Sequence, residues 1–288
     1  MRDIKIRNLE TIDFDTIFHA FGRSFADYAI SFEKEEVRSM LKRRGFNPRL
    51  SFAAFDGEEI IAFTLNGTGT YNGLPTAYDT GTGTVKEYRG RGIAQEIFNH
   101  SVPHLKAAGI KQYLLEVLQD NQKAISVYRK LGFEVTRDFD CFRQKTSALC
   151  SPSHKKAPAG ITIAPISLKE IAASHTYCDF HPSWQNSLES IERAGTDLRH
   201  LGAYDAAGKI TGYCVFDPVS GDITQIAVTP EQRGNGIATL LLRTAFPSVS
   251  SGNIKALNIP RECEAMRSFL LAWNFCPSAA QFEMSLPL

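Results

Sequence analysis

Tyr88-Arg89-Gly90-Arg91-Gly92-Ile93-Ala94 is the stretch that decides the fold, and its pattern returns as Gln232-Arg233-Gly234-Asn235-Gly236-Ile237-Ala238. Each copy follows a stretch typical of a strand and precedes a stretch typical of a helix. The offset between the copies is 144 residues (236 − 92), which is half of the 288-residue chain. The sequence therefore predicts a duplicated domain.

The segments around the two copies also agree. Asp56-Gly57 separates two apolar runs upstream of the first copy, which is a strong hairpin signal, and a turn over residues 205–208 does the same upstream of the second. Residues 151–160 have the proline, serine and glycine content of a linker. We predict a first domain over residues 1–146, a linker over 147–159 and a second domain over 160–288.

The first half predicts a mixed order of elements. Apolar residues at helical spacing favour helices over residues 14–28 and 34–44, and the turn precedes a predicted helix over 93–107. The remaining elements are strands over 4–7, 76–85 and 113–118 and a helix over 122–130. Strands and helices mix without strict alternation, so the predicted fold class is α/β, or α+β with a mixed sheet.

Composition excludes several classes of function. The net charge of +1 gives no global attraction to nucleic acid or to an anionic membrane. The charged and apolar residues alternate at the start of the chain, unlike a signal peptide, and no apolar run approaches the length of a membrane span. The six cysteines show no CxxC spacing and are expected to be reduced thiols. We expect a cytoplasmic protein without a metal, nucleic-acid or membrane partner; oligomeric state stays open.

The glycine turn has the chemistry of a phosphate site. A strand that ends in such a turn and opens a helix presents unpaired backbone N–H groups where the helix dipole is positive. A pyrophosphate fits that position. Gly90 and Gly92 let the backbone approach the ligand, and Arg89 and Arg91 can add charge to phosphate oxygens. The chain lacks the GxxxxGK[ST] pattern of a P-loop.

These residues resemble the GNAT acetyltransferase superfamily, whose pyrophosphate motif is [Arg/Gln]-x-x-Gly-x-[Gly/Ala]. Arg89, Gly92 and Ala94 match that motif in the first half, as Arg233, Gly236 and Ala238 do in the second. The family's downstream signature, Asn-x-x-Ala-x-x-x-Tyr-x-x-x-Gly-Phe, is complete in the first half at Asn121, Ala124, Tyr128, Gly132 and Phe133. The resemblance covers most of residues 1–145 and, more weakly, 160–288.

The resemblance implies two tandem domains, each a mostly antiparallel sheet with flanking helices and a strand that splays from its neighbour. It implies acetyl-CoA as co-substrate, with the pantetheine arm along residues 82–84 and the pyrophosphate on residues 90–95. The implied cofactor-binding residues are Thr82, Gly83, Thr84, Arg89, Gly90, Arg91, Gly92, Ile93, Ala94, Gln95, Asn121 and Tyr128.

For catalysis, the resemblance places Tyr128 as the acid that protonates the departing thiolate, or as a residue that only packs and hydrogen-bonds the cofactor sulfur. Glu116 and Asp79 are alternative candidates for the base. In the second half Phe269 stands at the position of Tyr128, and phenylalanine donates no proton. Asn258 is expected at the position of Glu116. We therefore expect catalysis in the first domain and a degenerate second domain.

The expected function is transfer of an acetyl group to a primary amine of a small molecule or peptide, by direct attack in a ternary complex. The alternative is a non-catalytic protein that binds or senses acyl-CoA. Arg-Gly-Arg-Gly also occurs in RNA-binding segments, but the near-zero net charge argues against a nucleic-acid-binding module.

Overall fold

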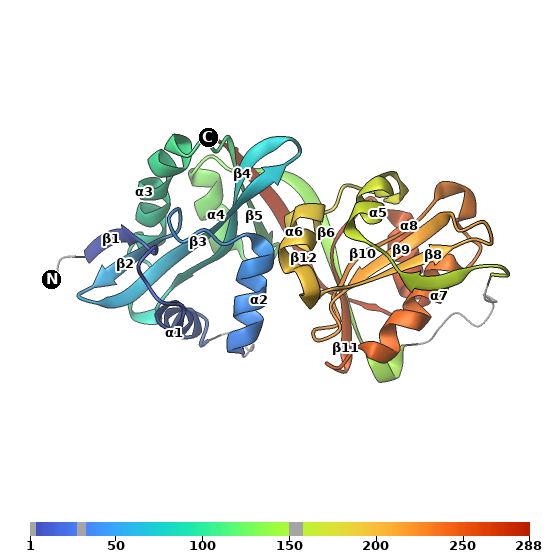
Figure 1. Cartoon of the computed structure of the whole chain (residues 1–288). Coiled ribbons are helices and arrows are strands. Elements are labelled where there is room, and N and C mark those ends of the chain that lie inside the picture. Colours follow the sequence, from blue (N-terminus) through green and yellow to red (C-terminus); the bar gives the residue numbers. More distant parts are fainter. Residues whose placement is uncertain (1–3, 28–32, 150–157) are drawn as a thin grey trace. The chain divides into compact units, whose positions relative to one another are not determined.

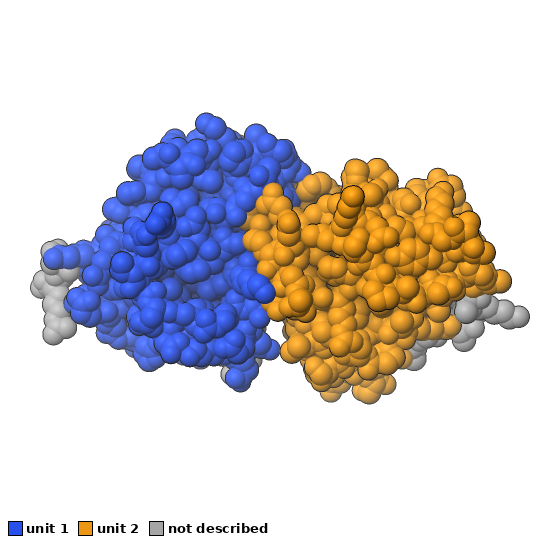
Figure 2. All heavy atoms as spheres, viewed as in Figure 1, with its two compact units in different colours: residues 1–136, 283–288 blue, residues 137–282 orange. Residues whose placement is uncertain are grey.

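The computed structural model describes residues 4–27, 33–149 and 158–288. The chain divides into two compact units, of which unit 1 comprises residues 1–136 and 283–288 and unit 2 comprises residues 137–282 (Figure 2). Both units combine helices with a mixed or antiparallel sheet, as the sequence predicts.

Unit 1 is built on a twisted sheet (Figure 1). Its elements are β1 Ile4–Asn8, α1 Phe14–Ser24, α2 Lys34–Arg44, β2 Phe52–Asp56, β3 Glu59–Tyr71, β4 Leu74–Thr84, α3 Ile93–Ala107, β5 Gln112–Leu118 and α4 Gln122–Lys130. Strands β1 to β4 pair antiparallel in chain order, and β5 joins β4 in parallel. The predicted hairpin is present, because Asp56 pairs with Glu59 around Gly57, whose φ of 65° suits glycine.

Helices cover both faces of the unit 1 sheet. The side chains of β2 alternate: Ala53 and Phe55 pack into the cluster of α1 and α2, whereas Phe52 and Ala54 pack against α3. This period of two follows from the pleat of a strand, which points successive side chains to opposite faces. Both faces of β2 are therefore buried, and its first four residues are all apolar.

Unit 2 repeats this order of elements, and most of them are shorter than in unit 1. They are β7 Thr162–Pro165, α5 Leu168–Ala173, α6 Leu188–Ala194, β8 Arg199–Tyr204, β9 Ile210–Phe216, β10 Ile223–Val228, α7 Ile237–Ala245, β11 Asn253–Pro260 and α8 Glu264–Ala272. Strands β7 to β10 form an antiparallel sheet in chain order.

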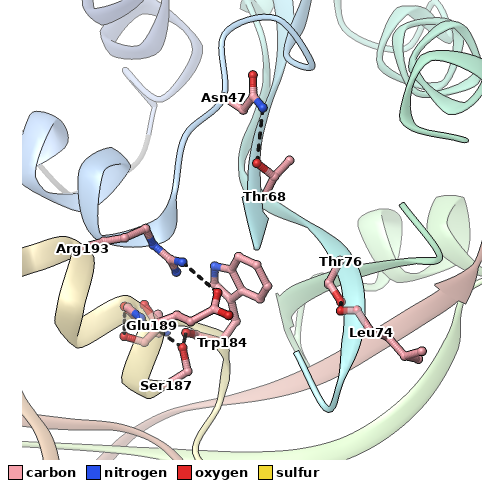
Figure 3. Close-up of polar contacts among 10 residues, drawn as sticks. Asn47, Thr68, Leu74, Thr76, Trp184, Ser187, Glu189 and Arg193 are labelled. Carbon is pink, nitrogen blue, oxygen red and sulfur yellow. Dashed lines mark hydrogen bonds and ion pairs between the residues drawn. The ribbon is translucent and has the colours of Figure 1, made fainter. Parts of the chain in front are cut away.

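Polar contacts fix the start of α6 (Figure 3). The Ser187 hydroxyl accepts from the Ser190 backbone N–H at 3.2 Å and donates to the Trp184 carbonyl oxygen at 2.8 Å. One turn later, the Arg193 guanidinium lies 5.3 Å from the centre of the Trp184 ring and 3.3 Å from the Glu189 carboxylate. The fully buried indole is thereby held against the helix.

Two long strands run through both units. β6 Glu134–Lys145 starts in unit 1 and pairs with β11 within unit 2, and β12 Cys276–Pro287 starts in unit 2 and ends in unit 1. Within unit 1, the backbone N–H of Leu288 donates to Lys111 at 2.8 Å. The unit boundaries therefore fall after residues 136 and 282, which differs from the boundary predicted at 147–159. Residues 150–157 of that predicted linker lie outside the described residues.

Two further predictions concern cysteines and membranes. In the described part of the chain, the cysteines are free thiols as predicted: Cys141, Cys178, Cys214, Cys263 and Cys276. Among the residues that the structure describes, no helix combines the length and the apolar character that a membrane span requires.

Candidate active site

The central feature of unit 1 is the divergence of β4 from β5. The two strands pair only from Thr76 to Tyr78, opposite Gln112 to Leu114. Beyond Tyr78, β4 continues to Thr84 with β3 as its partner. Within the described part of the chain, the predicted pantetheine strand, residues 82–84, therefore has no strand partner on the β5 side. This is the splay that the sequence resemblance implies.

Glycine is required at position 83 because the Phe63 ring and Ser24 pack closely against β4 there. A Cβ atom at this position would lie 2.7 Å from the Phe63 ring and 2.9 Å from the Ser24 Cβ, which is closer than real contacts allow. Helix α1 and strand β3 thus press against the backbone of β4 at this point. The diverging strand is supported on one side and leaves β5 on the other.

The predicted phosphate turn follows directly. Gly90 and Gly92 have φ of 77° and 79°, a left-handed backbone that glycine adopts without strain. Gly92 is the N-cap of α3 and brings no side chain to cap the helix. The first N–H groups of α3 are therefore presented at the surface, with Ile93 buried beneath them, Ala94 half-buried and Gln95 exposed. This geometry suits an anionic ligand.

The two arginines of the turn contact protein groups. Arg89 donates to the carbonyl oxygens of Thr84 and Ser24 and pairs with Asp27 at 2.8 Å. Arg91 donates to the Glu87 carbonyl oxygen at 2.7 Å. The sequence suggests charge for phosphate oxygens, but in the structure both guanidinium groups stabilise the turn itself.

Asp79 and Tyr128 meet where the strands diverge. The Tyr128 hydroxyl lies 3.5 Å from the Asp79 Oδ2 atom. Asp79 also accepts from the Thr82 hydroxyl at 2.8 Å and from the Gly81 backbone N–H at 2.9 Å. Asp79 is the first residue of β4 beyond the β5 pairing, so its carboxylate and the Tyr128 hydroxyl stand beside the predicted pantetheine strand.

The pKa of Asp79 is raised. Burial is the main cause, because it penalises the charged carboxylate, and it raises the pKa from 3.8 to about 6. The hydrogen bonds from Thr82 and Gly81 and the charge of Arg44 oppose this rise. A carboxyl that titrates near pH 6 can exchange a proton under physiological conditions, which an ordinary aspartate does poorly.

Glu116, the other predicted base, interacts with Tyr78, whose hydroxyl also feels the charges of Arg44 and Asp79. Its negative charge, after burial, is the next cause that raises the pKa of the Tyr78 hydroxyl well above its ordinary value. The guanidinium of Arg44 lies 6.0 Å from the centre of the same ring and donates to the Thr80 carbonyl oxygen at 3.1 Å. The structure therefore joins Asp79 with Tyr128, and Glu116 with Tyr78.

Asn121 acts locally on helix α4. Its side-chain oxygen accepts from the Ala124 backbone N–H at 3.2 Å, which makes Asn121 the N-cap of the helix that carries Tyr128. At the other end of α4, the Phe133 ring packs edge-on against Tyr128, with 5.6 Å between ring centres. The downstream signature thus fixes the helix and the orientation of its tyrosine.

Unit 2 keeps the binding geometry. β10 and β11 are joined by a single parallel bridge between Asp222 and Lys255 and then diverge. Gly234 and Gly236 again have left-handed φ, of 80° and 87°. A cavity of about 270 Å³ lies at this turn and is lined by Asp179, Ile226, Ala227, Val228, Gln232, Arg233, Gly234, Gly236, Ile237, Ala238, Thr239, Ala265, Met266 and Phe269.

Unit 2 has no counterpart of Asp79 or Tyr128 at the aligned positions. At the 144-residue offset, Ile223 replaces Asp79, and Phe269 lines the cavity where the alignment expects a tyrosine. Asn258 is buried and donates from its amide to the Ser183 hydroxyl at 3.0 Å. The cavity of unit 2 can hold a ligand, but none of these three positions supplies an acid or a base.

Sequence reasoning missed Asp27 and Arg44, and it did not pair Tyr78 with Glu116. Each acts through contacts with residues far along the chain, and no local motif marks any of them. For Asp27 the sequence holds a partial signal, since Asp179 forms the equivalent pair with Arg233 in unit 2, at 2.6 Å. A comparison of the two halves outside the glycine turn could have drawn attention to it.

Among the described residues, no group of three metal-ligating side chains is placed to hold a metal ion.

The acetyltransferase (GNAT) family model matches residues 14–133 and 167–259, which together are well over half of the chain. The chain therefore belongs to the GNAT family and carries two GNAT-like regions. The matched segments are those that hold the two glycine turns and the diverging strands.

Named relatives match part of the chain. N-alpha-acetyltransferase 30 of Schizosaccharomyces pombe is 34% identical over 87 residues, which are 30% of this chain and 58% of that protein. Mycothiol acetyltransferase of Streptomyces scabiei is 32% identical over 113 residues, which are 38% of this chain and 36% of that protein. The matches thus span less than two thirds of the length of these relatives.

Solved structures support the tandem fold. A tandem GNAT protein from the clavulanic acid biosynthesis pathway is 17% identical, with a TM-score of 0.72 over 99% of this chain and 98% of that one. A GCN5-related N-acetyltransferase from Sphaerobacter thermophilus is also 17% identical, with a TM-score of 0.71 over 99% and 95% of the two chains. At this identity the likeness concerns the fold alone.

Proposed function

We propose that unit 1 transfers the acetyl group of acetyl-CoA to a primary amine of a small molecule or peptide, by direct attack in a ternary complex. The observation that carries the proposal is the contact between the Tyr128 hydroxyl and the Asp79 carboxylate at 3.5 Å, where β4 leaves β5. An acid and a base stand together beside a strand that has left β5 and a turn suited to a pyrophosphate. GNAT membership supports the acyltransferase class.

The binding part of the proposal uses backbone groups. Residues 82–84 hold the pantetheine arm, and the N–H groups of residues 90–95 hold the pyrophosphate. In support, Gly92 caps α3 without a side chain. A Cβ atom at Gly90 or Gly92 would meet no atom of the described residues within 4 Å beyond its own chain neighbours, so the space over the turn is open. Binding both substrates together replaces a bimolecular encounter by an oriented attack.

The chemical part of the proposal assigns one proton transfer to Asp79 and one to Tyr128. The neutral amine attacks the thioester carbonyl carbon, and a backbone N–H of residues 82–84 stabilises the oxyanion. Asp79 takes a proton from the amine nitrogen. Tyr128 gives its hydroxyl proton to the sulfur as the C–S bond breaks. Because the two side chains are in contact, the proton on Asp79 can pass to the Tyr128 phenolate and restore both groups.

Asp79 is the favoured base over Glu116. Its carboxylate contacts the proposed acid directly, and its pKa of about 6 leaves it mostly ionised at neutral pH yet able to hold a proton briefly. Glu116 stays the alternative, in a role that binds the positively charged amine before it loses its proton. Cytoplasmic location stays a prediction from the sequence.

The names of the relatives support only a broad class of acceptor. The names N-alpha-acetyltransferase and mycothiol acetyltransferase describe enzymes of different substrates, one of which is defined by an α-amino group. These names support an amine acceptor and leave peptide and small-molecule acceptors open.

A second candidate function concerns unit 2. The cavity of about 270 Å³ at its turn supports acyl-CoA binding without transfer, since Phe269 and Ile223 supply no proton. Calorimetric titration of the full chain with acetyl-CoA tests it: two sites are expected for wild type and one for Ala238→Glu, which places a carboxylate in the cavity. The matched variant in unit 1 is Ala94→Glu. A single site in wild type that Ala238→Glu leaves intact contradicts binding by unit 2.

Transfer is tested by following free thiol release with acetyl-CoA and a panel of amines. Wild type is expected to release thiol with at least one amine, and Tyr128→Phe to lose most of that rate, about 100-fold for removal of a general acid. Phe269→Tyr in unit 2 is the control and is expected to change nothing. If Tyr128→Phe retains full activity, Tyr128 is not the acid.

A further inference from the structure

Arg89 contacts three protein oxygens from its place in the glycine turn. Its Nε donates to the Thr84 carbonyl oxygen at 3.0 Å, and one terminal nitrogen donates to the Ser24 carbonyl oxygen at 2.8 Å. The other terminal nitrogen pairs with Asp27 at 2.8 Å. All three guanidinium nitrogens are engaged by protein oxygens, from the end of β4 and from the end of α1.

Unit 2 repeats this arrangement. Arg233 donates from Nε to the Val228 carbonyl oxygen at 3.2 Å and from a terminal nitrogen to the Tyr177 carbonyl oxygen at 3.1 Å. Its remaining terminal nitrogen pairs with Asp179 at 2.6 Å. In both units the strand oxygen belongs to the residue five positions before the arginine. The same three-point contact therefore occurs twice, although the acid and base have been lost from unit 2.

The guanidinium fork explains why arginine suits this position. It is planar and holds its donors in fixed directions, so one side chain can join three acceptors. The segment it fixes needs such support, because it contains Gly90 and Gly92, which lose more conformational freedom on ordering than other residues. The charge of Arg89 is met by Asp27, which also lies 3.4 Å from the Lys86 ammonium.

We propose that Arg89 is a positioning residue: it sets the affinity for acetyl-CoA by tying the glycine turn to the ends of β4 and α1, with Asp27 as its anchor, and it is not a direct ligand of the phosphates. This inference rests on the function proposed for unit 1. It makes the shape of the cofactor site depend on helix α1, which lies outside the turn.

Asp27→Asn separates positioning from direct phosphate binding by the sign of its effect. If Asp27 anchors Arg89, its loss loosens the turn and raises the KM for acetyl-CoA. If Arg89 instead served the phosphates, removing its competing carboxylate would release the guanidinium toward them and lower the KM. We expect the KM for acetyl-CoA to rise about tenfold with kcat within about twofold, the pattern of lost binding that is equal in the ground and transition states. A lowered KM overturns the proposal.

Substitutions of Arg89 give a second, independent test. Lysine keeps the charge but has no planar fork, whereas glutamine loses the charge but keeps a planar amide with two N–H donors for the Thr84 and Ser24 carbonyl oxygens. We expect Arg89→Lys to raise the KM for acetyl-CoA more than Arg89→Gln does. The reverse order is expected of a phosphate ligand and also overturns the proposal.

Controls separate a positioning role from general stability. The Arg89–Asp27 pair is exposed to solvent, 38% and 42% respectively, so its loss is expected to change Tm little while the KM changes strongly. Arg49→Lys, at another exposed arginine–carboxylate pair of unit 1 (Arg49 with Glu10 at 2.8 Å), is expected to leave the KM and kcat of transfer unchanged. If wild type transfers no acetyl group to any amine, the proposed function fails; if it does and both Arg89 variants keep the wild-type KM, only this inference fails.

Discussion

Replacing Asp79 by asparagine is expected to change how the stability of unit 1 depends on pH. Burial raises the pKa of this carboxyl from 3.8 to about 6, so the folded chain binds the proton more tightly than the unfolded chain does. Stability from this group is therefore fully present below about pH 4 and is lost as the pH rises through 6. Asparagine has no proton to lose and removes that dependence.

The magnitude follows from the two pKa values. At about 1.36 kcal/mol for each pH unit between 3.8 and 6, ionisation of Asp79 costs the fold about 3 kcal/mol above pH 6. We expect the free energy of unfolding of Asp79→Asn, relative to wild type, to rise by about that amount between pH 4 and pH 7. Asparagine keeps an oxygen for the Gly81 N–H, so the loss of hydrogen bonds is small beside this term.

The measurement is urea unfolding at several pH values between 4 and 8, followed by far-UV circular dichroism. Both tryptophans, Trp184 and Trp273, lie in unit 2, so their fluorescence reports that unit separately. Asp27→Asn is the control. The hydrogen bond from Arg89 is the main cause that lowers the pKa of Asp27, but the pair is exposed to solvent, so this substitution is expected to change the free energy of unfolding little across the same pH range. A difference between Asp79→Asn and wild type that stays flat from pH 4 to 7 would refute the reasoning.

Three further outcomes are expected. The kcat/KM of wild type should rise with pH to a plateau above about 6, because Asp79 must lose its proton to act as a base, and a profile without that inflection contradicts the assignment. Gly83→Ala should destabilise the chain by about 1–3 kcal/mol in urea unfolding, because the added methyl meets Phe63, whereas Gly22→Ala in α1, where space is open, should stabilise it by about 0.5–1 kcal/mol. Asn121→Ala should cost about 1 kcal/mol through loss of the helix cap, and a neutral result would contradict the capping role.

Local signals predict the elements around the site well. Helices over residues 93–107 and 122–130 match α3 and α4 at both ends, because a glycine turn and an asparagine cap mark their starts within a few residues of sequence. The sequence predicts a first helix that reaches Tyr28, but α1 ends at Ser24, since apolar residues at helical spacing continue beyond the point where the backbone leaves the helix. Tyr28 itself lies outside the described residues.

Long-range contacts are beyond prediction from one sequence. The family resemblance brings Asp79 and Tyr128 to adjacent elements, but the contact of their oxygens depends on how α4 packs. The three-point contact of Arg89 includes Ser24, which is 65 positions away in the chain. The glycine-turn motif that contains Arg89 suggests a phosphate ligand instead. No turn residue in the sequence of β6 or β12 marks the position at which each strand passes from one compact unit to the other.

The passage of β6 and β12 between the units means that unit 2 is an insertion within unit 1. It occupies one continuous stretch, residues 137–282, while unit 1 is made of the segments on either side. The flanking residues are already neighbours, since the Thr136 hydroxyl donates to the Glu283 carboxylate at 2.9 Å. A chain with residues 137–282 excised and a short turn in their place would keep every segment of unit 1, whereas truncation at residue 146 would remove the strand that Leu288 anchors. All segments of unit 1 are therefore kept together by excision of residues 137–282 and not by truncation of the chain.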